Sequence, residues 1–437
     1  MAKAKTSVSG CKPMYVWLVK LEEQVPTDPV FRPYRMSMLA DALHSKGHTV
    51  TRWCSDYDHL ARMQRFGKDH TVKYKSSYDI RFIHASVSYQ KPVSLRRLLN
   101  NQLLYHKFHK QAVKAADQNK PDLIVGAMPT PSMAKACALL ARKSKAPLVL
   151  DARDMWPDII ATELTGAKAL LASPVIALMR KDLRFACREA TGLVGITDFF
   201  LNYLLRYAGR KAGPLDCVFE LGFQPTGTKL NESISAKFWR EQQVNLYDDV
   251  IIYFAGRLNS TISSVFEPVI QAARDLQQIH PRVKFVFCGS GQHRDKVTGM
   301  AEGCSNIILP GEIDHDNLYW LRKHSLAGIQ PVARREDYQN SLSNKFFEYI
   351  SSGLPVISWL QGISKELIEK HDCGYTYNSA TELLQCITSL IKSPSTRETL
   401  SRNALDLFKS RFEAEIIYQN FVNYLEDVTK FSSCGSP

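Results

Sequence analysis

The chain lacks the cysteine spacings and the long apolar runs that mark several common classes of protein. Its ten cysteines form no CxxC pair and no cluster at histidine spacing, so the sequence predicts neither a zinc site nor a disulfide framework. Reduced thiols in a cytosolic protein are the expected state. The early apolar run, residues 14–19, is too short for a signal peptide, and no run approaches the roughly 20 residues that span a bilayer. We therefore expect a protein that is neither secreted by such a signal nor integral to a membrane.

Positive charge is in excess, but only in the first half of the chain. Residues 1–215 hold 34 Lys and Arg against 17 Asp and Glu, whereas residues 216–437 hold 22 against 26. This asymmetry favours an anionic partner for the first half: a phosphate-bearing acceptor, an acidic membrane surface or nucleic acid. The alternative is that the basic surface only keeps the protein soluble.

Strand-length apolar runs recur in two sets, separated by helix-length stretches. Continuous rather than alternating apolar character is typical of parallel strands covered on both faces, so the sequence predicts an α/β fold with two doubly wound, Rossmann-like domains. A break containing Gly and Pro at 208–214 predicts a linker between domains 1–212 and 213–412, and a last helix at 413–430 is expected to pack back on the first domain. Ligand sites are expected at the carboxyl ends of the strands, in a cleft between the domains. The predicted strands are 15–19, 48–53, 79–83, 122–126, 147–151, 192–196, 249–255, 283–289, 306–311, 326–331 and 354–359.

The segment 341–355, SLSNKFFEYISSGLP, carries the most specific pattern. Ser343 or Asn344 is placed to cap a helix whose first backbone N–H groups suit a diphosphate, and Lys345 adds a positive charge. Glu348 lies one turn further along the face of Asn344, as an acceptor for sugar hydroxyls. The alternative is an ordinary amphipathic helix with a surface glutamate.

This segment resembles the nucleotide-binding helix of the retaining glycosyltransferases of family 4, which have the GT-B fold. The family pattern is Glu, seven residues, Glu, then a Gly-Leu-Pro-Val strand. The resemblance implies that Glu348 holds the ribose hydroxyls of the donor. The first Glu of the pattern falls at Asn340, a position that contacts the transferred sugar in the family, so the sugar contact departs from the pattern here.

Three further turns of the second half extend the resemblance. Gly256-Arg257 resembles the family's Gly-Arg turn, whose Arg reaches the donor phosphates, although the lysine that usually follows is replaced by the sequence NSTISS. Gly289 and Gly291 match a Gly-x-Gly turn that packs near the nucleotide. The sequence PGEI, which contains Glu312, resembles the loop beside the base. A solvated loop position is the alternative for Arg257.

The first half resembles a bacterial subgroup that builds lipopolysaccharide, capsule or related surface glycans, through PTDPVFRPYRMSMLADALHSKGHTVTRWCSDYDH and through RDMWP at 153–157. In the subgroup the second motif faces the cleft, which implies a catalytic or sugar-binding Asp154 and acceptor contacts from Arg153 and Trp156. A structural Arg–Asp pair beside a buried tryptophan is the alternative. Arg32 and Arg35 would suit an acceptor diphosphate, or they are surface charges.

The segment 94–114, SLRRLLNNQLLYHKFHKQAVK, combines leucines with five Lys and Arg residues. Such a helix is typical of an interface with anionic lipid, here through Arg96, Arg97 and Lys107. The alternative is that its apolar stripe packs on the sheet.

Together these features predict a retaining glycosyltransferase that moves a sugar from a nucleotide-sugar, with UDP favoured by family habit, to a glycan or lipid-diphosphate-linked acceptor. The expected role is the synthesis of bacterial surface polysaccharide (O-antigen, capsule or exopolysaccharide) by a cytoplasmic protein peripheral to the inner membrane. The predicted catalytic residues are Asp154, Arg257 and Lys345, with no metal or cofactor. Two alternatives stay open: a GT-B sugar-nucleotide 2-epimerase or hydrolase, and a non-catalytic basic protein that binds nucleic acid or membrane. No nucleic-acid partner is expected, because the strongest motifs lie in the acidic half.

Overall fold

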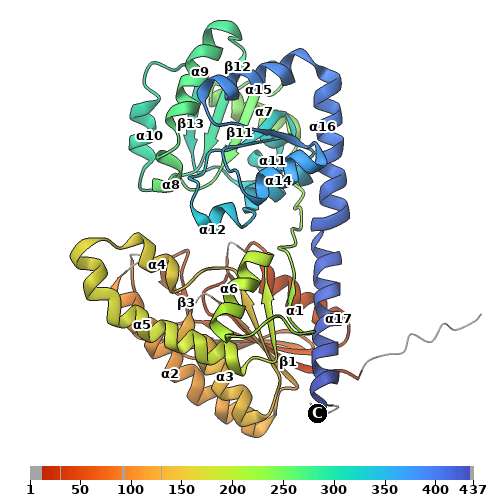
Figure 1. The fold of residues 1–437 in the computed structure, drawn as a ribbon. Coiled ribbons are helices and arrows are strands. Elements are labelled where there is room, and N and C mark those ends of the chain that lie inside the picture. Colours follow the sequence, from red (N-terminus) through yellow and green to blue (C-terminus); the bar gives the residue numbers. More distant parts are fainter. Residues whose placement is uncertain (1–11, 30, 91–93, 129, 434–437) are drawn as a thin grey trace, which may run out of the picture. The chain divides into compact units, whose positions relative to one another are not determined.

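The computed structural model describes residues 12–29, 31–90, 94–128 and 130–433. The chain divides into two compact α/β units, shown in Figure 1. Unit 1 comprises Met1–Gly222 and Ala414–Pro437, and unit 2 comprises Phe223–Glu413.

The boundary between the units lies ten residues beyond the predicted one at 212/213. The glycine at 209 ends a helix in the left-handed conformation, with φ of 70°. The chain then forms one more strand, β10 (Cys217–Val218), which pairs in parallel with β9 (Gly192–Gly195) of unit 1. The Gly- and Pro-containing break is therefore a turn inside unit 1.

Unit 1 is built on an eight-stranded sheet in the order β10-β9-β8-β7-β1-β2-β6-β5. All neighbours are parallel except β5 and β6, which are antiparallel. The order reverses between β1 and β7, so the loops that leave these two strands diverge to opposite sides and leave room between them for a ligand. The strands, with a separate two-stranded ribbon β3–β4, are β1 Tyr15–Val19, β2 Thr49–Ser55, β3 Tyr57–Asp58, β4 Met63–Gln64, β5 His70–Lys75, β6 Tyr78–Ile83, β7 Leu123–Ala127 and β8 Leu148–Ala152.

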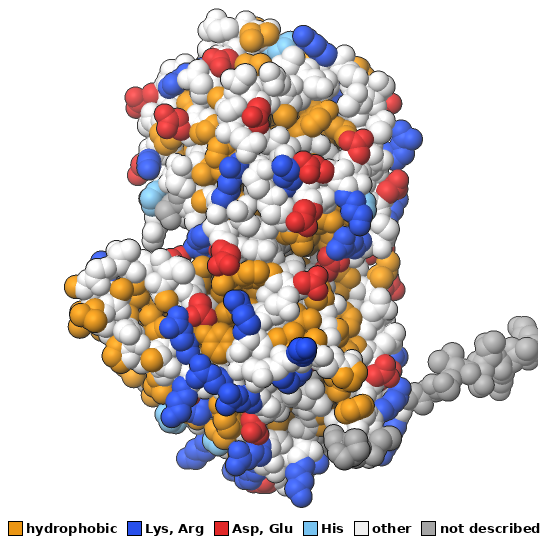
Figure 2. Space-filling model, viewed as in Figure 1, with side chains coloured by type: hydrophobic (Ala, Val, Ile, Leu, Met, Phe, Trp, Pro, Cys, Tyr) orange, Lys and Arg blue, Asp and Glu red, His pale blue; other side chains and the backbone are white. Residues whose placement is uncertain are grey.

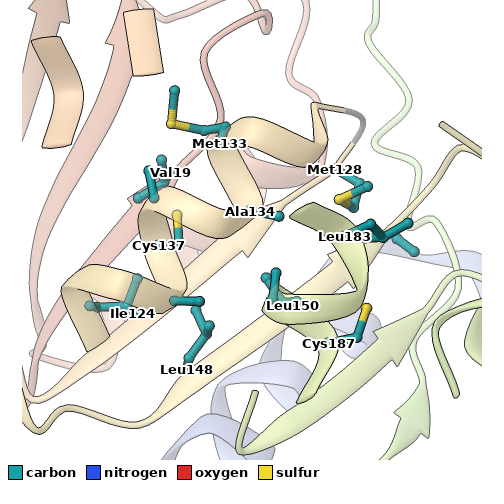
Figure 3. Close-up of a cluster of buried hydrophobic side chains, with 14 of the residues drawn as sticks. Val19, Ile124, Met128, Met133, Ala134, Cys137, Leu148, Leu150, Leu183 and Cys187 are labelled. Carbon is teal, nitrogen blue, oxygen red and sulfur yellow. The ribbon is translucent and has the colours of Figure 1, made fainter. Parts of the chain in front are cut away.

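Helices cover both faces of this sheet. One face packs on α2, α3, α5 and α6, and the other packs on α1 and α17. Figure 3 shows part of the first of these cores, where Met133 of α3 lies beside Val19 of β1 and Cys137 of α3 lies nearer Ile124. Both faces are buried, and for this reason the central strands have continuous apolar sequences. The helices are α1 Arg35–Ser45, α2 Leu95–Gln118, α3 Pro131–Ser144, α4 Asp158–Glu163, α5 Gly166–Glu189, α6 Asp198–Ala208 and α17 Ala414–Ser433.

The last helix, α17, packs on unit 1 beside α1. Phe421, Leu425 and Val428 of its predicted stripe are fully buried, whereas Ile416 is 43% exposed. An ion pair and a hydrogen bond fix the register of the helix: Glu426 accepts from the Lys46 ammonium at 2.7 Å and from the His48 imidazole at 3.1 Å. The C-terminal segment therefore completes the core of unit 1.

Unit 2 is built on a six-stranded, fully parallel sheet in the order β13-β12-β11-β14-β15-β16. In chain order this is 3-2-1-4-5-6, the arrangement of dinucleotide-binding sheets, and its order reverses between β11 and β14. The strands are β11 Val250–Ala255, β12 Val283–Cys288, β13 Ile307–Gly311, β14 Ser325–Gln330, β15 Val356–Ser358 and β16 Gly374–Thr376.

The two faces of the unit 2 sheet are covered by different helices. Ile252 and Phe254 of β11 face the apolar side chains of α9 and α15, and Tyr253 on the opposite face contacts Tyr349 of α13. None of the helices in the described part of the chain combines the length and apolar character that a bilayer crossing requires. The helices are α7 Glu232–Glu241, α8 Ser260–Ser263, α9 Glu267–Ile279, α10 Arg294–Met300, α11 His315–Lys323, α12 Glu336–Gln339, α13 Asn344–Ser351, α14 Ile363–His371, α15 Ala380–Lys392 and α16 Pro394–Leu407, followed by a π-helical turn, Phe408–Phe412.

Candidate functional site

The loops at the carboxyl ends of β11 and β12 are hydrogen-bonded to each other beyond the sheet. The backbone N–H of Gly256 donates to the carbonyl of Cys288 at 2.9 Å, and that of Leu258 donates to the carbonyl of Ser290 at 2.9 Å. These bonds hold the predicted Gly-Arg and Gly-x-Gly turns side by side at the edge where α/β sheets bind ligands.

The two glycines of the Gly-x-Gly turn allow this close approach. A Cβ atom at Gly289 would lie 2.0 Å from the carbonyl oxygen of Gly256, and one at Gly291 would lie 2.2 Å from that of Leu258. Gly289 also has a φ of 131°, which side chains rarely adopt. Any larger residue would therefore separate the two loops.

A pocket of about 280 Å³ opens beside the reversal of strand order in unit 2. Its volume is close to the lower end, about 300 Å³, of the range for small-molecule sites. The lining contains two cations, an amide, three hydroxyls of Ser and Thr, and a tyrosine, but no carboxylate, which suits an anionic ligand. The lining residues are Arg257, Asn259, Thr261, Ile262, Val332, Tyr338, Ser341, Ser343, Lys345 and Leu360.

Helix α13 brings Lys345 over the Gly256-Arg257 turn. A Cβ atom at Gly256 would lie 2.6 Å from Lys345 Cε, so the lysine side chain lies directly on the glycine backbone. The ammonium also lies 5.1 Å from the centre of the Phe254 ring. Ser343 is the residue before the first turn, but its hydroxyl accepts from Gln330 at 2.7 Å instead of capping the helix. The predicted cations and the N-terminus of α13 therefore meet in one place.

Glu348 lies on α13, one turn beyond this group, and is half-buried. Burial raises the pKa of Tyr253, and the charge of Glu348 adds to the shift, so this carboxylate lies close to β11. Glu348 is not among the residues that line the pocket, and Asn344 is exposed at the first position of the helix. Their roles toward a nucleotide stay predictions.

Two other predicted donor contacts lie outside the pocket lining. Asn340 follows α12, and its side-chain amide donates to the carbonyl of Glu336 at 2.8 Å. The residue that stands in place of the first family glutamate therefore caps the end of α12. Glu312 is exposed after β13 and accepts a hydrogen bond from the Ser290 hydroxyl. That bond ties its loop to the Gly-x-Gly turn.

Four polar side chains of the pocket were not predicted: Asn259, Thr261, Tyr338 and Ser341. Asn259 and Thr261 belong to the sequence that replaces the family lysine. The side-chain oxygen of Asn259, Oδ1, accepts from the Thr261 hydroxyl at 2.6 Å. Polar residues directly after a buried strand were the available signal. Tyr338 lies in the short helix α12, and Ser341 begins the segment 341–355 that resembles the family, but neither residue was singled out from the sequence.

At the reversal of strand order in unit 1, a lysine joins the two strands. The ammonium of Lys20, which follows β1, donates to the carbonyl of Met128, which follows β7, at 2.5 Å. Burial lowers the pKa of Lys20 to about 8, and Arg153 lowers it further, while Glu22 and Glu23 oppose the shift. Sequence reasoning missed this residue, although a charged run after a buried strand was visible.

Both glutamates beside Lys20 are paired, and Glu23 is buried while Glu22 is half-buried. Glu22 accepts two hydrogen bonds from Arg97, at 3.0 and 3.1 Å. Glu23 accepts from Arg153 at 3.0 Å and from Arg52 at 3.2 Å. Although burial opposes ionisation, the arginines hold the pKa of both carboxyl groups below the usual value. The carboxyl edge of unit 1 thus contains a dense network of ion pairs.

Two of the predicted acceptor contacts are structural. The Arg35 side chain is fully buried and forms a bidentate ion pair with Asp151, at 2.8 and 2.9 Å. It also donates to the carbonyl of Glu220 at 2.8 Å, so it cannot reach an acceptor. Trp156 is buried under the guanidinium of Arg97, 4.7 Å from the ring centre, and is a packing residue without a free face for a sugar.

The contact between Arg97 and Trp156 contradicts the prediction that Arg97 of this helix meets anionic lipid. Arg97 is 7% exposed and held by Glu22, so it does not face a membrane, whereas Arg96 is exposed and Lys107 is half-exposed. The Ser94 side chain accepts from the Arg97 backbone N–H and caps the helix.

The remaining predicted residues of unit 1 are partly accessible. Arg153 retains 17% exposure beside Glu23, and Asp154 is half-buried, with Oδ1 accepting from the Met155 backbone N–H at 2.8 Å. Arg32 is half-buried in the segment before α1. Within the described ranges, no group of three or more His, Cys, Asp or Glu side chains could hold a metal ion.

Comparison with known proteins places both units in one class. Residues 35–218 match the family model of Glycosyltransferase Family 4, and residues 235–406 match that of Glycosyl transferases group 1. Spore coat protein SA of Bacillus subtilis (strain 168) is 24% identical over 208 residues, which cover 45% of this chain and 54% of that protein. The chain thus spans about half the length of this curated relative in the match.

Solved structures share the fold over almost the whole chain. Sucrose-phosphate synthase from Thermosynechococcus elongatus has a TM-score of 0.66 at 14% identity, covering 96% of this chain and 100% of that one. The Anabaena protein HepE in complex with UDP-glucose has a TM-score of 0.63 at 16% identity, covering 95% and 100%. With two Rossmann-like units that each match a glycosyltransferase family model, the chain belongs to the glycosyltransferases of the GT-B fold.

Proposed function

We propose that the protein is a retaining glycosyltransferase that moves a sugar from a UDP-sugar to a glycan or lipid-diphosphate-linked acceptor in the synthesis of a bacterial surface polysaccharide. The observation that carries the proposal is the pocket in which Arg257, Lys345 and the N-terminus of α13 converge beside the Gly256 backbone. Support for the donor comes from HepE, whose structure holds UDP-glucose.

The diphosphate of the donor binds between Arg257 and Lys345. As the bond between the sugar and the phosphate breaks, negative charge grows on the leaving diphosphate, and fixed cations with helix N–H groups stabilise that charge. Binding of the diphosphate and cleavage of the bond need no metal or cofactor when these groups stabilise the negative charge. We assign Glu348 to the ribose and the loop of Glu312 to the base. Tyr338 and Ser341 line the pocket, and we assign them, with Asn340 between them, to the sugar.

We assign the acceptor to the carboxyl edge of unit 1. Arg153 and Arg32 supply positive charge for an acceptor diphosphate, and Asp154 accepts a hydrogen bond from an acceptor hydroxyl. Lys20 and its paired glutamates hold this edge in place. The excess positive charge of residues 1–215 supports an anionic acceptor, and Arg96 and Lys107 favour a position on the anionic inner membrane.

A donor screen tests the proposal. Purified protein is incubated with UDP-, GDP- and dTDP-sugars, with and without polyprenyl-diphosphate-linked sugars, and released nucleotide and products are measured. We expect UDP release that depends on the acceptor and a product with the anomeric configuration of the donor. Free sugar and UDP at equal rates without any acceptor would identify the sugar-nucleotide 2-epimerase or hydrolase instead.

A further inference from the structure

The first half of α5 exposes large apolar side chains around most of its circumference. Leu170 and Leu171 are 77% and 79% exposed, Leu178 is 53% exposed, and Val175 is 42% exposed. Between residues 166 and 179 only Ile176 is buried. A helix that merely packs on its own domain buries its apolar side chains, so this half of α5 requires another partner.

The first turns of α2 add two more leucines to the same edge of unit 1. Leu95 is 84% exposed and Leu99 is 52% exposed. The contact between Arg97 and Trp156 places the start of α2 against the segment that leads into α4 and α5. We name the six exposed residues the apolar edge: Leu95, Leu99, Leu170, Leu171, Val175 and Leu178.

The charges around the apolar edge are mainly positive. Lys168 is the only charged residue between 166 and 179, and Lys181 and Arg184 are exposed on the following turns of α5. Asp182, between these two cations, is buried and paired with Lys135 at 2.7 Å, so it does not offset them.

Arg96 is exposed beside the two leucines of α2, and Glu163 of α4 is an exposed acidic residue nearby. Figure 2 shows apolar side chains at the left margin, where Figure 1 draws α4 and the start of α5, and Lys and Arg side chains gathered on the adjoining surface.

We propose that the apolar edge inserts into the surface of an anionic lipid bilayer. Leucines that enter the boundary between headgroups and acyl chains leave water, while the flanking cations meet anionic headgroups. The inference rests on the proposed function in one respect only, that a lipid-linked acceptor would lie in that bilayer. It places the insertion on α5 and the start of α2, instead of the middle of α2.

A second copy of the chain suits this surface less well. In a two-fold dimer each patch meets its own copy, so Lys168, Lys181 and Arg184 of the two chains would be brought together. Like charges across an interface oppose association, whereas a surface of anionic lipid neutralises them.

Vesicle sedimentation of the full-length protein tests the inference. We expect binding to phosphatidylcholine vesicles that contain phosphatidylglycerol, and much weaker binding to phosphatidylcholine alone. The double variant Leu170→Glu/Leu171→Glu should bind about 100-fold more weakly, because each leucine that leaves water contributes about tenfold. The matched control, Ile234→Glu/Ile279→Glu, changes side chains of unit 2 that are 58% and 57% exposed and should bind as the wild type does.

Light scattering and nucleotide release accompany the vesicle assay. Unchanged vesicle binding by the α5 variant would overturn the inference, and so would a wild-type dimer that this variant dissociates. Release of UDP from a soluble donor and acceptor should stay unchanged in both variants. If the wild type and both variants release no UDP, while the wild type binds vesicles and the α5 variant does not, the proposed function alone is contradicted.

Discussion

The two units place different chemistry at equivalent positions of their sheets. At the reversal of strand order in unit 2, Arg257 and Lys345 line an open pocket without a carboxylate. At the reversal in unit 1, Lys20 and Glu23 are buried in a network of ion pairs. The difference teaches that cations lining a pocket suit an anionic ligand, whereas buried ion pairs hold loops in fixed positions.

Removal of a buried partner in unit 1 should have the largest effect on stability. In Arg35→Ala, Asp151 is left buried without its bidentate partner, and breaking such a pair costs about 3–5 kcal/mol. Urea denaturation followed by circular dichroism measures the loss. Arg32→Ala, which changes a half-buried residue outside this pair, is the control and should keep the stability of the wild type. A fully stable Arg35→Ala protein with weakened acceptor binding would show that Arg35 contacts the acceptor after all.

In unit 2 the same kind of truncation should affect activity instead of stability. Lys345→Ala removes a cation that faces the pocket, and we expect turnover to fall by about 10²–10³-fold, as for other groups that stabilise charge in the transition state. Nucleotide release measures turnover, and thermal unfolding checks the fold. Lys365→Ala, on α14 of the same unit, removes a half-exposed lysine paired with Glu369 and serves as the control. Normal turnover in folded Lys345→Ala protein would show that the pocket does not hold the diphosphate.

The sequence predicted the parallel core of both sheets well, because a continuous apolar run of strand length is typical of a strand that is covered on both faces. It missed three of the four strands at the sheet edges, whereas the fourth, β13, matches the predicted strand 306–311. β5 is partly exposed and pairs in antiparallel, and β10 and β16 are only two and three residues long. Such strands have neither continuous apolar character nor sufficient length to be recognised.

The site was predictable to a similar degree. The Gly-x-Gly turn and Lys345 lie in local motifs, and the structure brings both to the Gly256 loop. By contrast, Arg35 and Asp151 are 116 positions apart, and Lys20 and Met128 are 108 apart. No local pattern shows that such distant residues are paired, so sequence reasoning placed Arg35 at the acceptor or on the surface and overlooked Lys20.

The smallest effect we expect is a change in pH dependence at Lys20. Because burial lowers the pKa of this lysine to about 8, it is charged at pH 7 and mostly neutral at pH 9. If its charge holds Glu22 and Glu23 in position, kcat/KM should fall about tenfold by pH 9. In Lys20→Arg the cation persists, and the alkaline decline should disappear.

As the pH rises, the free energy of unfolding should increase while kcat/KM falls. Between the folded pKa near 8 and the unfolded value of 10.5, the unfolded chain binds more protons at Lys20 than the folded chain does. The cost of burying the charge is therefore fully present below pH 8 and is relieved as the pH rises toward 10.5. The free energy of unfolding of the wild type should rise relative to that of Lys20→Arg across this window. Parallel pH profiles for the two proteins, in activity and in stability, would show that the ion-pair network of unit 1 holds its shape without this charge.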